Sequence, residues 1–281
     1  MIGLGSNRLS VCRRGGMSVT QAGRGGMEWL AGGRMPSWAS PYSAQATAAL
    51  LAQFPTQWPT IRDYGFAHPA LVPFINEDPM MVMSLIEGLG TRWIASDGNC
   101  WVDTEIVPDT NTEVEYKFKD ISGGAYDGAN SVIGVRVPDT DNGRFYPMAI
   151  ASNTSGRFVL GGSTVYFTVS VGNEYTAKFN EIGTHKSYLN GVLQGTHSTN
   201  ALTTTGNMYI FAANVGNNNV NWKTKIPYAY VNVKKSSNSL LASFVPFISQ
   251  TYGKGMLDVI GLAFHRKIGS GSFTISETPA S

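Results

Sequence analysis

The chain has 281 residues, a formal net charge of +2, 14% charged residues and 42% hydrophobic residues. This length can bury a sizeable core, and the hydrophobic content excludes an intrinsically disordered chain. The small net charge indicates no nucleic-acid partner, and two cysteines cannot build a disulfide framework. The sequence contains no run of 18 apolar residues, so no membrane span is predicted. The first residues do not follow the pattern of a secretory signal.

The composition changes near residue 90. All ten lysines follow residue 116, whereas seven of the 13 prolines lie between Pro36 and Pro79. One compact domain seldom separates residue types so sharply. We therefore predict three segments, which are an N-terminal arm over 1–40, a proline-rich linker over 41–90 and a folded domain over 91–281.

Residues 1–40 are rich in Gly and Arg and offer little to bury. An Arg-Gly-Gly-Met repeat begins at Arg14 and again at Arg24. One interpretation is a flexible tail, because ordering glycine loses much entropy. The other is an anchoring arm whose arginines pair with acidic groups and whose methionines fill apolar pockets of a partner. The candidate anchoring residues are Arg13, Arg14, Met17, Arg24, Met27, Arg34 and Met35.

Two short helices are expected in the linker. The alanine-rich segment from Ser43 to Phe54 has a plausible N-cap in Ser43. Asp78 followed by Pro79 has the pattern of an N-cap and a first helical residue, and Gly88 suits the helix end. The arm and linker together predict an extended, partly helical N-terminal part.

From residue 91 onward, short alternating apolar runs bounded by Gly, Asn and Asp predict β-strands. Asn190-Gly191 is the pair that a two-residue hairpin turn prefers. Many short strands at this spacing favour an antiparallel sandwich. The expected strands are 93–94, 100–103, 113–119, 131–137, 144–151, 157–160, 165–171, 174–180, 185–189, 192–196, 208–212, 223–233, 242–248 and 256–260.

Several segments of this region follow an order that is similar to a known family. They are WIASDGNCWVDTEIVP from Trp93, NTEVEYKF from Asn111, YLNGVL from Tyr188, MYIFAAN from Met208, AYVNV from Ala229, ASFVP from Ala242, GMLDV from Gly255 and GSGSF from Gly269. Over about residues 91–276 the chain resembles the concanavalin A-like (laminin-G-like) jelly-roll domain of gut Bacteroides proteins and their phages. The resemblance implies an all-β jelly-roll sandwich.

The same resemblance implies a role in a virus particle. In phages this domain occurs on head fibres, capsid decorations and tail fibres, where an N-terminal segment anchors the protein to the particle. We therefore expect a non-enzymatic virion component, contacting other virion proteins and forming a homotrimer or another homo-oligomer. Nucleic acid and membranes are not expected partners. The alternatives are a bacterial surface glycan-binding protein and, less favoured, a polysaccharide hydrolase.

Loops that combine amides, glycines and aromatic rings suit sugars, because rings stack on pyranose faces and amides bind hydroxyl groups. Ordinary strand connections or a subunit interface explain the same composition. The candidate glycan-binding residues are Tyr126, Asp127, Asn217, Asn219 and Trp222.

Three further patterns in the sequence allow a functional and a structural interpretation. Asp139 and Asp141 offer closely spaced oxygen ligands for Ca²⁺, but an Asx-rich turn forms without metal. We therefore expect no cofactor and keep calcium binding as the alternative.

Glu113 and Glu115 face the same side of one expected strand, where a solvent-facing role is favoured over glycosidase chemistry. His185 and His197 flank the Asn190-Gly191 hairpin and favour cross-strand polar pairing over a metal site. No nucleophile elbow or phosphate-binding loop is present.

Overall fold

The computed structural model describes residues 2–3, 19–20, 77–78, 92–120, 131–138, 140–152, 154–198, 202–216, 219–236 and 239–276. The chain divides into two units, Met1–Arg92 with Phe247–Thr251, and Trp93–Pro246 with Tyr252–Ser281. The anchoring-arm residues and the two expected helices lie outside the described residues, so the arm, the helices and the division at residue 40 stay predictions. In the described ranges, no helix is long and apolar enough to cross a membrane.

The first unit contains a parallel strand pair and a buried ion pair. β1 (Ile2–Gly3) pairs with β2 (Val19–Thr20). Arg92 Nη1 lies 2.7 Å from both carboxylate oxygens of Asp78, and the backbone N–H of Ile248 donates to the same carboxylate over 2.7 Å. Because the two charged side chains are only 4% and 5% exposed, these bonds replace the water that the charges have lost.

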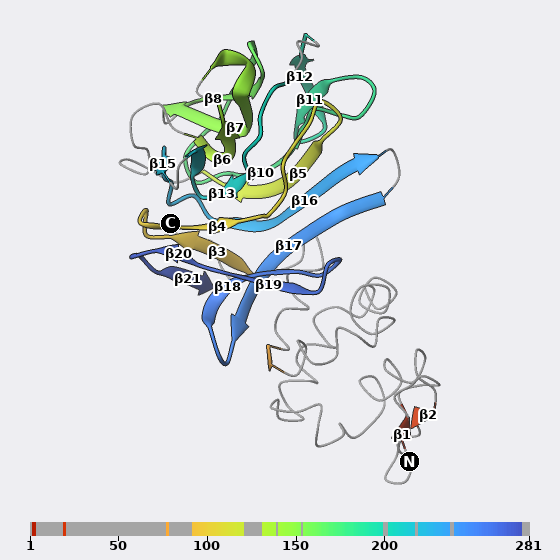
Figure 1. Ribbon diagram of the computed structural model, residues 1–281, viewed down its shortest axis with the longest axis vertical. Helices are drawn as coiled ribbons and strands as arrows, with labels where there is room; N and C mark the ends of the chain where they lie inside the picture. Colours follow the sequence, from red (N-terminus) through yellow and green to blue (C-terminus); the bar gives the residue numbers. More distant parts are fainter. Residues whose placement is uncertain are drawn as a thin grey trace. The chain divides into compact units, whose positions relative to one another are not determined.

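The larger of the two sheets that form the sandwich runs in the order β12-β11-β10-β5-β16-β17-β18-β19, and β3 pairs with both β16 and β21. Figure 1 shows two long strands of this sheet, β16 and β17, as a neighbouring pair. The strands are β3 (Trp93–Ser96), β5 (Glu113–Lys119), β10 (Glu174–Phe179), β11 (Lys186–Leu189), β12 (Val192–Thr196), β16 (Tyr228–Ser236), β17 (Ser239–Ser249), β18 (Gly253–Asp258), β19 (Ala263–Arg266) and β21 (Phe273–Ser276).

The second sheet runs in the order β20-β4-β13-β6-β7-β8-β9, with the β14–β15 hairpin attached to β6. All of its described pairs are antiparallel except β14 with β6. The strands are β4 (Cys100–Asp103), β6 (Ser131–Arg136), β7 (Arg144–Ser152), β8 (Ser155–Leu160), β9 (Ser163–Thr168), β13 (Tyr209–Ile210), β14 (Ala213–Gly216), β15 (Asn219–Asn221) and β20 (Ile268–Gly269).

The core lies between the two sheets and follows from strand alternation. On β5, Val114, Tyr116 and Phe118 are fully buried, because residues two apart share one face of a strand. The Tyr116 hydroxyl donates to the Pro147 carbonyl over 2.8 Å, and burial raises the pKa of Tyr116 well above its ordinary value. The predicted all-β sandwich is therefore confirmed.

The sandwich has two seams, where an end strand of the first sheet contacts a strand at, or next to, the end of the second sheet. At the β9–β12 seam, β12 of the first sheet contacts β9 of the second. At the β19–β4 seam, β19 contacts β4, and the chain crosses from the first sheet to the second through Lys267, between β19 and β20.

The strand predictions hold best where alternation is regular. The expected strands 100–103, 113–119 and 192–196 agree with the structure residue for residue. Asn190 and Gly191 have φ values of 49° and 76°, as the predicted hairpin turn requires.

Most other expected strands differ from the structure at their ends, and for two of them the physical reason is clear. The strand expected over 223–233 begins only at Tyr228, because Pro227 has no N–H to donate. The strand expected over 208–212 shrinks to Tyr209–Ile210, since Phe211 adopts a φ of 73° and turns the chain before β14.

Candidate functional site

A pocket of about 440 Å³ opens at the β19–β4 seam. It lies where the end of β4, the β17–β18 turn, β19 and the start of β20 come together. Its lining residues, all in the second unit, are Asp103, Glu105, Tyr252, Phe264, His265, Arg266 and Ile268.

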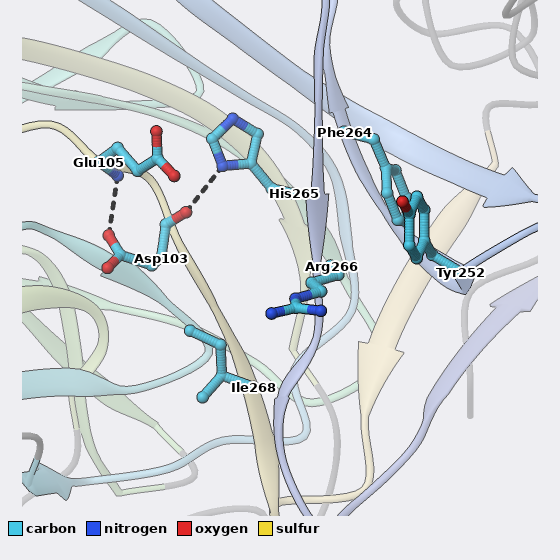
Figure 2. Close-up of a pocket in the computed structure, with 7 residues that line it drawn as sticks. All are labelled: Asp103, Glu105, Tyr252, Phe264, His265, Arg266 and Ile268. Carbon is cyan, nitrogen blue, oxygen red and sulfur yellow. Dashed lines mark hydrogen bonds between the residues drawn. The ribbon is translucent and has the colours of Figure 1, made fainter.

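Two acidic residues line one end of the pocket (Figure 2). Asp103, the last residue of β4, accepts the Glu105 backbone N–H at Oδ1 over 2.8 Å and the Asn207 amide at Oδ2 over 3.3 Å. The first bond closes a tight turn in which Glu105 has a φ of 60°, a conformation that non-glycine residues seldom adopt. Asp103 therefore acts as a positioning residue for the exposed carboxylate of Glu105.

His265 ties β19 to β4 across the seam. Its Nδ1 lies 2.9 Å from the Asp103 carbonyl oxygen, and a carbonyl only accepts, so Nδ1 is the donor. The Phe244 ring packs edge-on against the imidazole, with 5.1 Å between ring centroids. In the neutral imidazole these contacts leave Nε2 as a hydrogen-bond acceptor.

Two aromatic rings form the other end of the pocket (Figure 2). Tyr252 and Phe264 stack with ring centroids 6.0 Å apart and an interplanar angle of 16°. Gly255 makes room for this pair, because a Cβ at that position would come within 2.6 Å of the Phe264 ring. Tyr252 is 63% exposed, so the pair presents an aromatic surface to solvent. We call Tyr252 and Phe264 the aromatic ledge.

Arg266 lies between the two ends of the pocket in the close-up (Figure 2). It is exposed at the end of β19, and no acidic side chain in the described part of the chain forms an ion pair with it. The pocket thus combines hydrogen-bond acceptors, a guanidinium donor and an aromatic surface. Such a set suits a ligand that is rich in hydroxyl groups and has one apolar face.

Of the five glycan-binding residues predicted from sequence, only Asn219 and Trp222 are described, and neither lines this pocket. Tyr126, Asp127 and Asn217 lie outside the described residues, and Asn219 is exposed on β15. Trp222 is half-buried and packs edge-on against Tyr146, with 5.6 Å between centroids, while Arg136 lies 5.8 Å from its ring centroid. Trp222 therefore covers a small apolar cluster on β7, β8 and β14.

The expected calcium ligands are only partly described. Asp141 begins a 3-10 turn, η8 (Asp141–Gly143), and its carboxylate pairs with Arg144 over 2.6 Å. Asp139 lies outside the described residues, and no group of three metal-ligating side chains occurs within them. Calcium binding by Asp139 and Asp141 stays a prediction.

Glu113 and Glu115 share the outer face of β5, as the alternation predicted, but Glu113 is not solvent-exposed. It is 5% exposed, and its carboxylate lies 3.2 Å from Lys234 Nζ and 3.2 Å from the Ile182 backbone N–H that donates to it. The expectation of a solvent-facing side chain is therefore wrong for Glu113. The aliphatic stem of a neighbouring lysine and a loop can cover a carboxylate that strand alternation places outside.

The two hairpin histidines are joined through the backbone, because the His197 N–H donates to the His185 carbonyl over 2.8 Å. Their side chains have separate partners. His185 Nδ1 lies 2.9 Å from Asn180 Oδ1, and His197 Nε2 lies 2.9 Å from Ser187 Oγ. The predicted cross-strand polar pairing is therefore present, but it runs through the backbone and through Ser187 rather than between the two imidazoles, because His197 is 3% exposed and packs against Phe179.

Sequence reasoning missed the lining of the pocket. Asp103 was predicted only as the last residue of the strand 100–103, and Glu105 lies beyond the end of that strand. The sequence predicted no strand at Ala263–Arg266 or at Ile268–Gly269. Two features of the sequence could have indicated this site. They are the basic run His265-Arg266-Lys267 in a chain with few charges, and the turn pattern Tyr252-Gly253 that precedes it.

No family model matches this sequence, and no curated protein matches it. One similar solved structure is the native heptameric SAP-like pentraxin of Limulus polyphemus, which is 12% identical with a TM-score of 0.38 and covers 53% of this chain and 78% of its own. Another is a candidate carbohydrate-binding protein from Bacteroides ovatus, which is 11% identical with a TM-score of 0.47. That match covers 68% of this chain and 61% of the Bacteroides protein. Because both TM-scores are below 0.5, the function proposed for this chain rests on its own geometry.

Proposed function

We propose that this chain is a non-enzymatic glycan-binding protein that holds a sugar ring in the pocket at the β19–β4 seam. The observation that carries the proposal is the aromatic ledge beside hydrogen-bonding groups of both polarities. The apolar face of a pyranose stacks on an aromatic ring. Its hydroxyl groups donate to the Glu105 carboxylate and accept from the Arg266 guanidinium.

The first test is the removal of the ledge. In Tyr252→Ala, affinity for whichever oligosaccharide binds the intact chain should fall about tenfold, measured by titration calorimetry. Tyr166→Ala is a matched control, because Tyr166 on β9 is 65% exposed and Tyr252 is 63% exposed. Equal affinity of both variants for the glycan would contradict a site at the ledge.

The finer proposal is that the chain is a phage virion component, as head fibre, capsid decoration or tail fibre, with residues 1–40 as its anchor and other virion proteins as partners. It is supported by the order of the segments that resemble the concanavalin A-like family and by the change in composition near residue 90. Self-association into a homo-oligomer belongs to the same proposal.

Virion location is tested by deleting residues 1–40. The truncated chain should keep its strand content by circular dichroism but fail to enter particles, as measured by mass spectrometry of purified virions. Incorporation at the normal level overturns the anchoring role. Absence of the intact chain from particles overturns the virion role and favours the bacterial surface glycan-binding protein.

A further inference from the structure

The β19–β4 seam has an excess of exposed positive charge. Lys254 on β18, Arg266 at the end of β19 and Lys267 directly after it are all exposed. The Lys267 ammonium donates only to the Gly269 carbonyl over 3.3 Å, and none of the three cations forms an ion pair within the described ranges.

Six of the basic side chains elsewhere in the described residues show the contrast. Arg92, Lys117, Arg144, Lys178, Lys234 and Lys235 each pair with a carboxylate at 2.6 to 3.6 Å. The one acidic residue between Tyr252 and Ile268 is Asp258. Its oxygens accept the backbone N–H groups of Ser243, Ile260 and Gly261, and it is 7% exposed. Asp258 therefore offers no exposed partner to the three cations.

The two carboxylates of the pocket differ in whether their oxygens already accept hydrogen bonds from the protein. Both oxygens of Asp103 accept hydrogen bonds from Glu105 N–H and from Asn207. The side chain of Glu105 has no such partner in the described part of the chain, yet the turn holds it at the opposite end of the pocket from the ledge (Figure 2). A ligand that fits this arrangement has hydroxyl groups facing Glu105 and an anionic group facing Arg266.

We propose that the pocket selects an acidic saccharide, whose carboxylate or sulfate group pairs with the Arg266 guanidinium while the sugar ring packs on the Tyr252–Phe264 ledge. This inference rests on the proposed glycan-binding function and names its ligand class. The guanidinium presents paired N–H donors that match the two oxygens of a carboxylate or sulfate. Lys254 and Lys267 add an electrostatic attraction for the anionic group. This attraction does not depend on the orientation of the ligand, and salt weakens it.

The test compares three probes, which are oligogalacturonate for the carboxylate, a heparin-derived oligosaccharide for the sulfate and a cello-oligosaccharide as the neutral sugar. In Arg266→Gln, affinity for the preferred acidic probe should fall about tenfold, while any affinity for the neutral probe stays within about twofold. Arg266→Lys should give an intermediate loss, because it keeps the charge but not the paired donors. Lys186→Gln on β11 is the charge-matched control, and unfolding curves confirm that each variant folds.

The outcomes separate the two proposals. Loss confined to acidic probes supports the inference, and the better of the two acidic probes identifies the anionic group. If Arg266→Gln leaves acidic binding unchanged, or weakens neutral binding equally, the acidic-saccharide inference fails, while a loss in Tyr252→Ala still supports glycan binding at this site. If none of the three probes binds the intact chain and a broad panel of oligosaccharides also gives no binding, both proposals fail.

Discussion

The two seams of the sandwich each contain a histidine, but the β9–β12 seam is closed and the β19–β4 seam is open to solvent. At the β9–β12 seam, His197 is 3% exposed and packs on Phe179, with 5.2 Å between ring centroids. Gly195 allows β12 to approach Val165, since a Cβ there would lie 3.0 Å from the valine methyl. At the β19–β4 seam, His265 is half-buried and a pocket of about 440 Å³ remains open.

The difference shows what each seam contributes. The closed seam extends the apolar core to the edge of the sandwich, where burial provides the stabilisation. Across the open seam, a side-chain bond runs from His265 to the Asp103 carbonyl, and polar side chains such as Glu105 and Arg266 face water. We therefore expect changes at the closed seam to affect stability, and changes at the open seam to affect binding.

The largest expected effect is a cavity at the closed seam. Phe179 is fully buried and contacts the rings of Phe145, Phe158 and His197. Phe179→Ala should lower the free energy of unfolding by about 3–5 kcal/mol. Phe264→Ala at the open seam should cost about 1 kcal/mol or less, because its ring is only half-buried. Urea unfolding of both variants checks the contrast, and equal losses would remove the distinction between the seams.

The next largest effect is a pH dependence of stability that arises at the closed seam. Burial lowers the pKa of His197 from 6.5 to about 4. The unfolded chain takes up this proton more readily than the folded chain, so protonation favours unfolding. The free energy of unfolding therefore has its full value above pH 6.5 and decreases as the pH falls towards about 4. The loss amounts to about 3 kcal/mol.

His197→Gln should remove this part of the pH dependence, because a glutamine does not titrate. The measurement is the free energy of unfolding of both chains above pH 6.5 and near pH 4. A stability difference between the two chains that stays constant over this range would show that His197 does not titrate as described.

The smallest effect is expected at the turn that positions Glu105. Asp103→Asn keeps an acceptor for the Glu105 N–H but loses the charge and the bond from Asn207, so stability should fall by about 1 kcal/mol. Burial, followed by the negative charge of Asp103, raises the pKa of Tyr209. The substitution should therefore lower that pKa while leaving it above its ordinary value, as an ultraviolet titration would record. An unchanged Tyr209 pKa would show that the Asp103 charge does not act on the Tyr209 hydroxyl.

Local patterns in the sequence were enough to predict the strands of the core and one turn. The alternation around Val114, Tyr116 and Phe118 identifies β5 because side chains two apart share a face whatever the strand packs against. Asn190-Gly191 predicts its turn because both residues tolerate a positive φ. The very short strands β13 to β15 and β20 were predicted poorly, since two to four residues contain too little alternation to detect.

The sequence by itself determined the all-β class, the alternation of the core strands and the Asn190-Gly191 turn, since each depends on residues that are close along the chain. Only the tertiary structure decided where the pocket lies and which histidine is buried. Asp103 and His265 are 162 positions apart and meet only because β19, the end strand of the first sheet, contacts β4, which lies next to the end strand β20 of the second sheet. His197 and His265 have the same imidazole, and their different exposure follows from which strands close over each ring. Strand periodicity contains no information about which edges of two sheets come together, so that part of the site had to be read from the fold.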